Sequence, residues 1–156
     1  MKALVLTGPR RLEIVDIDTP KPPQNWVLIR VKYAGICGSD IGGFLGINKQ
    51  YRPPIIMGHE FSGTIEDVGS GVSKNVIGRF VTVNPIIGCG QCRYCKIGLR
   101  NLCKNRKIIG IHLPGAFAEY VVVPIENVFQ IEDPLLGALI EPLATSYRAY
   151  KLAQPI

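Results

Sequence analysis

A chain of 156 residues that is 47% hydrophobic and 19% charged has the composition of one globular domain, which excludes an intrinsically disordered protein. Its formal net charge is +6, and no apolar run approaches the roughly 20 residues that a membrane-spanning helix needs. The apolar run that follows Lys2 ends at Gly8-Pro9 and is too short for a secretory signal. We therefore expect a cytoplasmic protein without a membrane partner, in which thiols stay reduced.

The first third of the chain consists of short β-type segments. Residues 2–7 and 12–18 are β-branched or alternate in polarity, and they predict two strands paired as a hairpin. A proline-rich connection follows, and residues 26–34 then predict the clearest strand. One face of this strand is expected to carry Val27, Ile29, Val31 and Tyr33.

The remaining elements are shorter. A short helix is expected soon after residue 40, and strands are expected at 61–68, 79–83, 116–123 and 128–131. From Pro134 onward apolar residues recur at helical spacing, and Pro142 is expected to divide this stretch into two short helices. Short strands rich in glycine and proline, followed by late helices, predict a mainly β, barrel-like domain.

One turn resembles a phosphate-binding loop. Gly69-Ser70-Gly71 follows a predicted strand, as the first glycines of the dinucleotide fingerprint do. The fingerprint needs a further glycine where this chain has Lys74, so we do not expect this turn to bind a dinucleotide.

Four of the five cysteines gather in one segment, as Cys89, Cys92, Cys95 and Cys103. Two disulfides would require an oxidising compartment, and iron–sulfur clusters use spacings that are similar but not the same. We favour zinc, because four thiolates at these short spacings can surround one ion tetrahedrally. Such a set leaves no open coordination position, which marks a structural site.

Basic side chains crowd the same segment, as Arg93, Lys96, Arg100, Lys104, Arg106 and Lys107. They suit either a nucleic-acid surface or the balancing of a dianionic metal–thiolate group. We favour the second interpretation and expect no nucleic-acid partner, because the segment lacks interleaved aromatics and a basic helix face. Four thiolates and one zinc ion would lower the formal charge from +6 to about +4.

The fifth cysteine, Cys37, follows the predicted strand 26–34. A histidine and a carboxylate, His59 and Glu60, stand next to each other further along the chain. One thiolate, one imidazole and one carboxylate with a water would make an open zinc site of the catalytic type. The alternative is a buried free cysteine and a structural loop histidine, and the spacing alone does not separate the two.

Four motifs occur in a fixed order: Gly-Ile-Cys-Gly-Ser-Asp at 35–40, Gly-His-Glu-Phe-Ser-Gly at 58–63, the four cysteines, and Glu-Pro-Leu at 141–143. In this order they resemble the N-terminal catalytic domain of the zinc-dependent medium-chain dehydrogenases, in the alcohol dehydrogenase superfamily. The polyol (sorbitol) and threonine dehydrogenase branch is the most similar. The resemblance implies one domain over residues 1–156: a GroES-like β-barrel with a structural zinc lobe at 88–107 and short C-terminal helices.

The resemblance implies a ligand set for a catalytic zinc. Cys37 and His59 match two ligand positions of the family. Glu60 matches the adjacent carboxylate, which binds the metal in polyol-type relatives, and Glu141 matches a position that supplies a further carboxylate in this branch. Two zinc ions are therefore expected, one catalytic and one structural.

Three other residues match family positions with different roles. Ser39 resembles the hydroxyl that takes the substrate proton, and Asp40 resembles the carboxylate that orients His59. Thr145 lies where the family contacts the nicotinamide. Gly42 stands where many relatives have a histidine that relays the proton to solvent, so another group or water must serve here.

The reaction implied by the resemblance is oxidation of a secondary alcohol or polyol to a ketone with NAD or NADP. The family continues into a Rossmann domain, which we do not find in these residues, so we expect zinc binding without turnover by this chain alone. Expected partners are the small alcohol and either a second copy or a complementary Rossmann-domain chain. The alternatives are a stand-alone zinc-binding interaction module and, ranked last, a co-chaperonin suggested only by the fold name.

Overall fold

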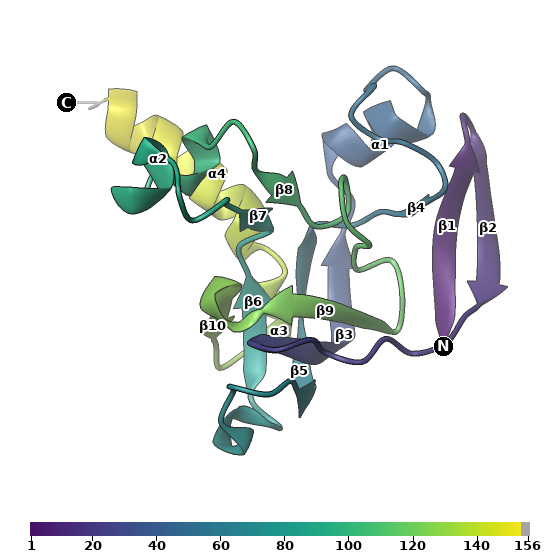
Figure 1. Cartoon of the computed structure of the whole chain (residues 1–156). Helices are drawn as coiled ribbons and strands as arrows, with labels where there is room; N and C mark the ends of the chain where they lie inside the picture. The colour runs from purple at the N-terminus through teal and green to yellow at the C-terminus, as the bar shows by residue number, and fades with distance from the viewer. Residues whose placement is uncertain (154–156) are drawn as a thin grey trace.

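The computed structural model describes residues 1–153, and antiparallel sheets are its main regular structure (Figure 1). A three-stranded sheet has the order β2 (Arg11–Asp16), β1 (Lys2–Gly8), β4 (Ile55–Ile56). A five-stranded sheet has the order β10 (Val128–Gln130), β6 (Phe80–Val83), β5 (Glu60–Val68), β3 (Trp26–Gly35), β9 (Tyr120–Pro124). A small ribbon pairs β7 (Ile86–Ile87) with β8 (Lys107–Ile108).

The helices are short except for the last one. The α-helices are α1 (Gly38–Phe44), α2 (Arg93–Lys96), α3 (Pro134–Gly137) and α4 (Ile140–Ala153). Single 3-10 turns are η1 (Lys74–Val76), η2 (Arg100–Leu102) and η3 (Ile125–Asn127). No helix within residues 1–153 combines the length and the apolar character that crossing a membrane requires.

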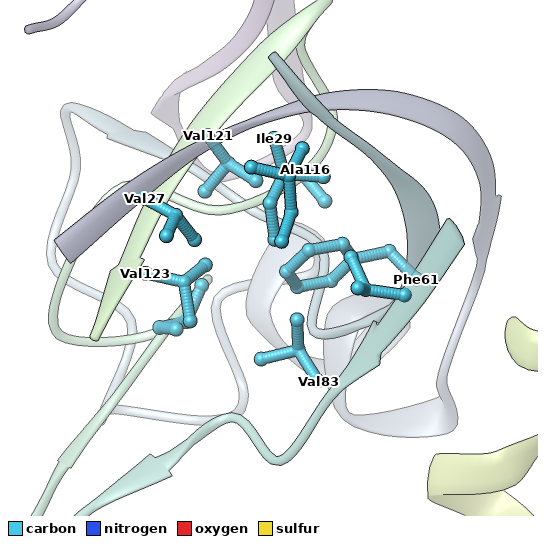
Figure 2. Packing of buried hydrophobic residues seen from close by; sticks show 10 residues of the cluster. Val27, Ile29, Phe61, Val83, Ala116, Val121 and Val123 are labelled. Atoms are coloured by element: carbon cyan, nitrogen blue, oxygen red, sulfur yellow. The ribbon is translucent and has the colours of Figure 1, made fainter. Parts of the chain in front are cut away.

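The main core lies against the five-stranded sheet, and Figure 2 shows its side chains converging. Val27, Ile29 and Val123 are fully buried, and Phe61 is 1% exposed. Each such side chain contributes roughly 1.5–3 kcal/mol by leaving water. Because Phe61 follows Glu60 directly, this core also fixes the start of strand β5.

The predicted mainly β class and the N-terminal hairpin are confirmed. β1 and β2 pair antiparallel from Lys2 opposite Asp16 to Gly8 opposite Arg11. The strand expected at 116–123 is shorter than predicted, because β9 begins at Tyr120. Before it, Ala118 forms only an isolated bridge to Ala3.

The prediction that Tyr33 lies on the same face of β3 as Val27 and Ile29 is wrong. Tyr33 was expected beside Val27 and Ile29, but its side chain is 45% exposed. The pairing of β3 with β5 shifts register twice, and one shift falls between Val31 and Tyr33. A bulge of this kind turns the following side chain away from its former face.

The C-terminal stretch forms two helices, as predicted, but the break comes earlier than Pro142. α3 ends at Gly137 and α4 begins at Ile140, so Pro142 lies in the first turn of α4. Proline is tolerated there because the first-turn N–H groups have no partner within the helix. α4 runs for 14 residues and is therefore longer than the short helix expected.

Candidate metal centres

The register of two strands brings Cys37, His59 and Glu60 together. Gly35 at the end of β3 pairs with Glu60 at the start of β5. Cys37 is the N-cap residue of α1, two positions after β3 ends. One ligand atom from each of Cys37, His59 and Glu60 lies within 4.8 Å of the other two. His59 and Glu60 are buried, and Cys37 is half-buried.

Two glycines next to these residues, Gly35 and Gly58, make room for neighbouring side chains. A Cβ atom added to Gly35 would lie 2.5 Å from Glu60 Oε2. Gly58 has a φ of +94°, in the left-handed region, and a Cβ there would meet the Phe117 ring at 2.6 Å. Gly35 therefore leaves room for the Glu60 carboxylate, and Gly58 lets Phe117 pack against the chain directly before His59.

Asp40 is buried behind His59. Its Oδ1 lies 3.5 Å from His59 Nδ1, which makes no shorter contact with a polar atom. Asp40 also accepts hydrogen bonds from the Cys37 backbone N–H at 3.0 Å and from the Tyr51 hydroxyl at 2.9 Å. These contacts hold the carboxylate in place beside the imidazole, at the position from which the resemblance expects it to orient the ring.

The charged side chains of this group shift one another's pKa values. Burial alone would lower the pKa of His59, but hydrogen bonding and charge from Asp40, together with Cys37, raise it to about 9. Burial works against ionisation of Asp40, yet its bonds to His59 and Tyr51 leave its pKa lowered. A metal that binds His59 must therefore displace a proton from the imidazole.

Ser39 contacts the ring nitrogen of His59 that faces away from Asp40. Its Oγ lies 3.3 Å from His59 Nε2 and 3.3 Å from the Tyr51 hydroxyl oxygen. Tyr51 is 5% exposed, and its ring fits against Gly43, where an added Cβ would lie 2.6 Å away. The sequence analysis missed Tyr51, because it stands in a loop outside every motif.

Glu141 and Thr145 come from the C-terminal helix α4. Glu141 is half-buried in the first turn of α4 and is not one of the residues within 4.8 Å of one another. Burial and the charges of Glu60 and Asp40 raise its pKa, against the opposing effect of His59. Glu141 and the exposed Thr145 both line a hollow of about 1050 Å³ between α4, β6 and the cysteine lobe.

The four clustered cysteines converge as their spacing predicted. Their sulfur atoms all lie within 4.8 Å of one another, and Cys103 is fully buried. All of them are free thiols. A Cβ added to Gly88 would lie 2.7 Å from Cys95 Sγ, so this glycine makes room for the sulfur group.

Backbone N–H groups and crowding act on these thiols in opposite directions. The N–H groups of Gln91 and Cys92 lower the pKa of Cys89 to about 6. Burial, together with the neighbouring sulfurs, raises the pKa of Cys95 to about 11. Four ionised sulfurs at this separation repel one another, and a divalent cation between them would remove that repulsion.

Several basic residues of the cysteine segment contact neighbouring groups of the same domain. Arg100 bonds to Glu126 at 2.8 Å, and Arg106 donates to the Cys103 carbonyl at 3.2 Å. Arg93 lies over the Tyr94 ring, 4.8 Å from its centroid.

The Asn127 amide donates to the carbonyls of Asn84 and Ile86 and ties the base of the lobe to the barrel.

Comparison with known proteins gives close relatives over the whole chain. An L-galactonate-5-dehydrogenase from Escherichia coli (strain K12) is 37% identical over 98% of this chain and 46% of its own length. An L-threonine 3-dehydrogenase from Pyrococcus furiosus is 39% identical over 100% of this chain and 47% of its own length. The chain thus spans about half the length of these curated relatives.

A solved structure agrees with this similarity. The alcohol dehydrogenase rspB from Escherichia coli CFT073, in complex with NADH, superposes with a TM-score of 0.94 at 37% identity. The match covers 99% of this chain and 46% of that chain. The model of the alcohol dehydrogenase GroES-like domain matches residues 23–133, which include the cysteine lobe and the Cys37–His59–Glu60 group. With its mainly β fold and these relatives, the chain belongs to the alcohol dehydrogenase GroES-like domain family.

Proposed function

We propose that this chain is the zinc-binding catalytic portion of a dehydrogenase that oxidises a secondary alcohol of a small molecule, such as a polyol, with NAD or NADP. The observation that carries the proposal is the convergence of Cys37, His59 and Glu60, of which the last two are buried. A thiolate, an imidazole and a carboxylate that leave one position open are typical of catalytic zinc. The similarity to L-galactonate-5-dehydrogenase and L-threonine 3-dehydrogenase, and the NADH bound in a similar solved structure, support the proposal.

Two zinc ions per chain are proposed. Cys37, His59 and Glu60 would hold the first, with Glu141 as a further carboxylate from α4, and the four clustered cysteines would hold the second. The ligand atoms of Cys37, His59 and Glu60, which lie within 4.8 Å of one another, and the converging sulfurs of the four cysteines fit bound metal. When bound, the first zinc supplies a positive charge that lowers the pKa of the substrate hydroxyl.

The chain's own residues would then orient the imidazole and carry the proton. Asp40 keeps the proton of His59 on Nδ1, so Nε2 presents its lone pair to the site. Ser39 lies beside Nε2 and is proposed to take the substrate proton. The Tyr51 hydroxyl, within 3.3 Å of Ser39 Oγ, offers a second hydroxyl where Gly42 replaces the relay histidine of many relatives.

Cofactor binding would involve Thr145 at the nicotinamide, while the dinucleotide itself needs a Rossmann domain. The Gly69–Lys74 turn does not meet the fingerprint, so we expect the 156-residue chain alone to form no NAD(P)H from an alcohol. Association with a complementary Rossmann-domain chain or with a second copy is part of the proposal. The free thiols of both centres fit a reducing compartment, for which we propose the cytoplasm.

Metal analysis of the wild-type chain and two variants tests the proposal. The purified wild-type chain should contain two zinc ions, and Cys37→Ser and Cys95→Ser should each lose one, but different ones. Cobalt substitution separates the sites, because one carries a single thiolate and the other four. A wild-type chain with one zinc that Cys37→Ser leaves unchanged would contradict the catalytic site.

A stand-alone zinc-binding interaction module is the second candidate. It is favoured by the apolar side chains that α3 and α4 expose, among them Leu136, Leu143 and Tyr147 at 60%, 62% and 59%. Such a patch on a folded chain marks a contact surface. Size-exclusion chromatography with light scattering is the test: a monomer without a co-purifying chain counts against this candidate.

A further inference from the structure

A hollow of about 610 Å³ lies between the loop that includes Lys49–Ile55 and the segment from Lys107 to His112. The side chains of Lys49, Arg52 and Lys107 line it, together with the neutral hydrogen-bonding groups of Gln50 and His112. No acidic residue is among the described residues that line it. Ordinary protein surface intersperses charges of both signs, so a concave surface lined by one sign attracts a counter-ion.

The cations of this hollow are not neutralised by other parts of the described chain. The salt bridges within residues 1–153 use Lys2, Arg30, Arg100 and His59, and leave out Arg52 and Lys107. Lys49 donates to the Gly46 carbonyl at 2.7 Å, which is a neutral acceptor and leaves its charge uncompensated.

His112 adds a donor of fixed direction. Its Nδ1 accepts a hydrogen bond from the Ile108 backbone N–H at 3.2 Å, so the neutral ring carries its proton on Nε2. Burial, followed by the charges of Lys107, Arg106 and Arg52, lowers the pKa of His112 and keeps the ring neutral near pH 7. The basic groups that converge here thus create a positive potential, and this potential contributes to the lowered pKa of His112.

The floor of the hollow is held by packing. Ile55 and Ile111 line it and belong to the cluster that buries Leu6 and Tyr51. Ile55 also pairs with Leu6 across β4 and β1. The donors are therefore carried on two segments that the fold fixes against each other, which reduces the entropy that a ligand must overcome.

We propose that this hollow is an anion-binding site, in which Arg52, Lys107 and His112 take the phosphate or carboxylate group of a small molecule. Arginine and lysine donate charge-assisted hydrogen bonds to such groups, and the arginine fork can donate two in parallel. The site goes beyond the proposed dehydrogenase function, because it uses none of the residues of either metal centre.

The anion can come from two sources, which share this chemistry: free inorganic phosphate, or the ionised group of an alcohol substrate. Titration of the zinc-loaded chain with inorganic phosphate and with sorbitol 6-phosphate distinguishes them. A substrate group would make sorbitol 6-phosphate shift the backbone amide resonances of Ser39 and His59 as well as those of the hollow. If the site takes a free anion, inorganic phosphate and sorbitol 6-phosphate should both shift only the amide resonances of the residues that line the hollow.

The binding test is an NMR titration of the 156-residue chain with phosphate at constant ionic strength, with chloride as the counter-titrant. We expect saturable shifts at the amides of Arg52, Lys107 and His112. Arg52→Gln with Lys107→Gln should weaken binding at least about tenfold, because both charge-assisted hydrogen bonds to the anion are lost. The matched control is Lys21→Gln with Lys74→Gln, two exposed cations elsewhere with the same change in net charge.

Shifts that do not saturate, or equal affinity in the two double variants, would overturn the proposal and leave only a solvated basic surface. If the spectrum shows that the Arg52/Lys107 double variant is misfolded, Arg52→Gln alone answers the question, since its side chain is exposed. Phosphate binding needs no zinc at Cys37 and His59. A chain that does not bind phosphate would therefore leave the proposed dehydrogenase function standing, and a chain without zinc at Cys37 and His59 would leave the proposed anion site standing.

Discussion

The cysteine lobe and the Cys37–His59–Glu60 pocket could both hold a metal, yet the chain builds them in opposite ways. Cysteines 89 to 103 come from one short segment, which the two-residue ribbon of β7 and β8 flanks. The pocket is assembled at the ends of β3 and β5, the two longest strands of the main sheet.

The two regions also differ in what surrounds them. The lobe exposes Ile97 and Leu102 at 66% and 48%, so it buries few apolar groups of its own. The pocket lies on the barrel core, with Phe61 fully enclosed directly after Glu60. We infer that metal would hold the lobe together, whereas the barrel holds the pocket whether or not metal is bound. The following variants test that difference.

The largest expected effect is that of Cys95→Ser on the lobe. Structural zinc sites of this kind contribute about 10–16 kcal/mol to folding, and removal of one thiolate from four should cost most of the affinity. We expect loss of one zinc and rapid amide exchange across residues 88–107, measured by metal analysis and hydrogen exchange. Amides of β3 and β5 should stay protected, and their exposure would show that the barrel depends on the lobe.

Next in size is Phe61→Ala, which acts on the barrel. Truncation of a buried phenylalanine costs about 3–5 kcal/mol, because it leaves a cavity beside the start of β5. Chemical denaturation should show this loss while the lobe keeps its zinc. Phe129→Ala is the matched control, since that side chain is 54% exposed and its truncation should change stability by less than about 0.5 kcal/mol. Equal losses in both variants would contradict the assigned core.

Asp40→Asn should act on the pocket alone. Removal of the carboxylate behind a ligand histidine lowers metal affinity about 10- to 100-fold. Titration with cobalt, followed by its absorption, measures this at the pocket, and the lobe site serves as an internal reference. Asp67→Asn is the control, because Asp67 is exposed and its carboxylate accepts a hydrogen bond from the Val68 backbone N–H at 2.8 Å, away from the pocket. A similar decrease in both variants would argue against an orienting role.

The smallest effect should come from Gly35→Ala, which tests Glu60. The added methyl group would overlap Glu60 Oε2 and force that carboxylate to move, at about 1–3 kcal/mol. If Glu60 is a ligand, pocket affinity for cobalt should fall about tenfold. Gly38→Ala places a methyl group where nothing lies within 4 Å and should change nothing. Unchanged affinity in Gly35→Ala would remove Glu60 from the ligand set.

Sequence analysis predicted the secondary structure well where the signal was local. The hairpin of residues 2–16 and the strand from Trp26 follow from alternation and turns, and both are present. Tyr33 was misplaced because alternation assumes an unbroken ladder, and the bulge after Val31 depends on the partner strand β5. The convergence of the four cysteines was predicted from spacing, since a short segment can turn its own sulfurs inward.

The pocket was a weaker prediction from spacing, because Cys37 and His59 are distant in the chain and meet only through the β3–β5 register. Resemblance to a family named these residues, but it said nothing of Tyr51, whose hydroxyl bonds to Asp40. The basic hollow was missed altogether, since Arg52 and Lys107 look like ordinary surface charges until the fold brings them together.

The sequence by itself determined the longer strands, the clustering of the four cysteines and the family, because each depends on residues near one another or on motifs in fixed order. Only the tertiary structure decided which side chains share a site: Glu60 beside Cys37, Tyr51 beside Ser39 and Asp40, and Arg52 beside Lys107. The physical reason is that strand register and core packing act between distant segments, and no local pattern encodes the distance between two side chains that such pairing brings together.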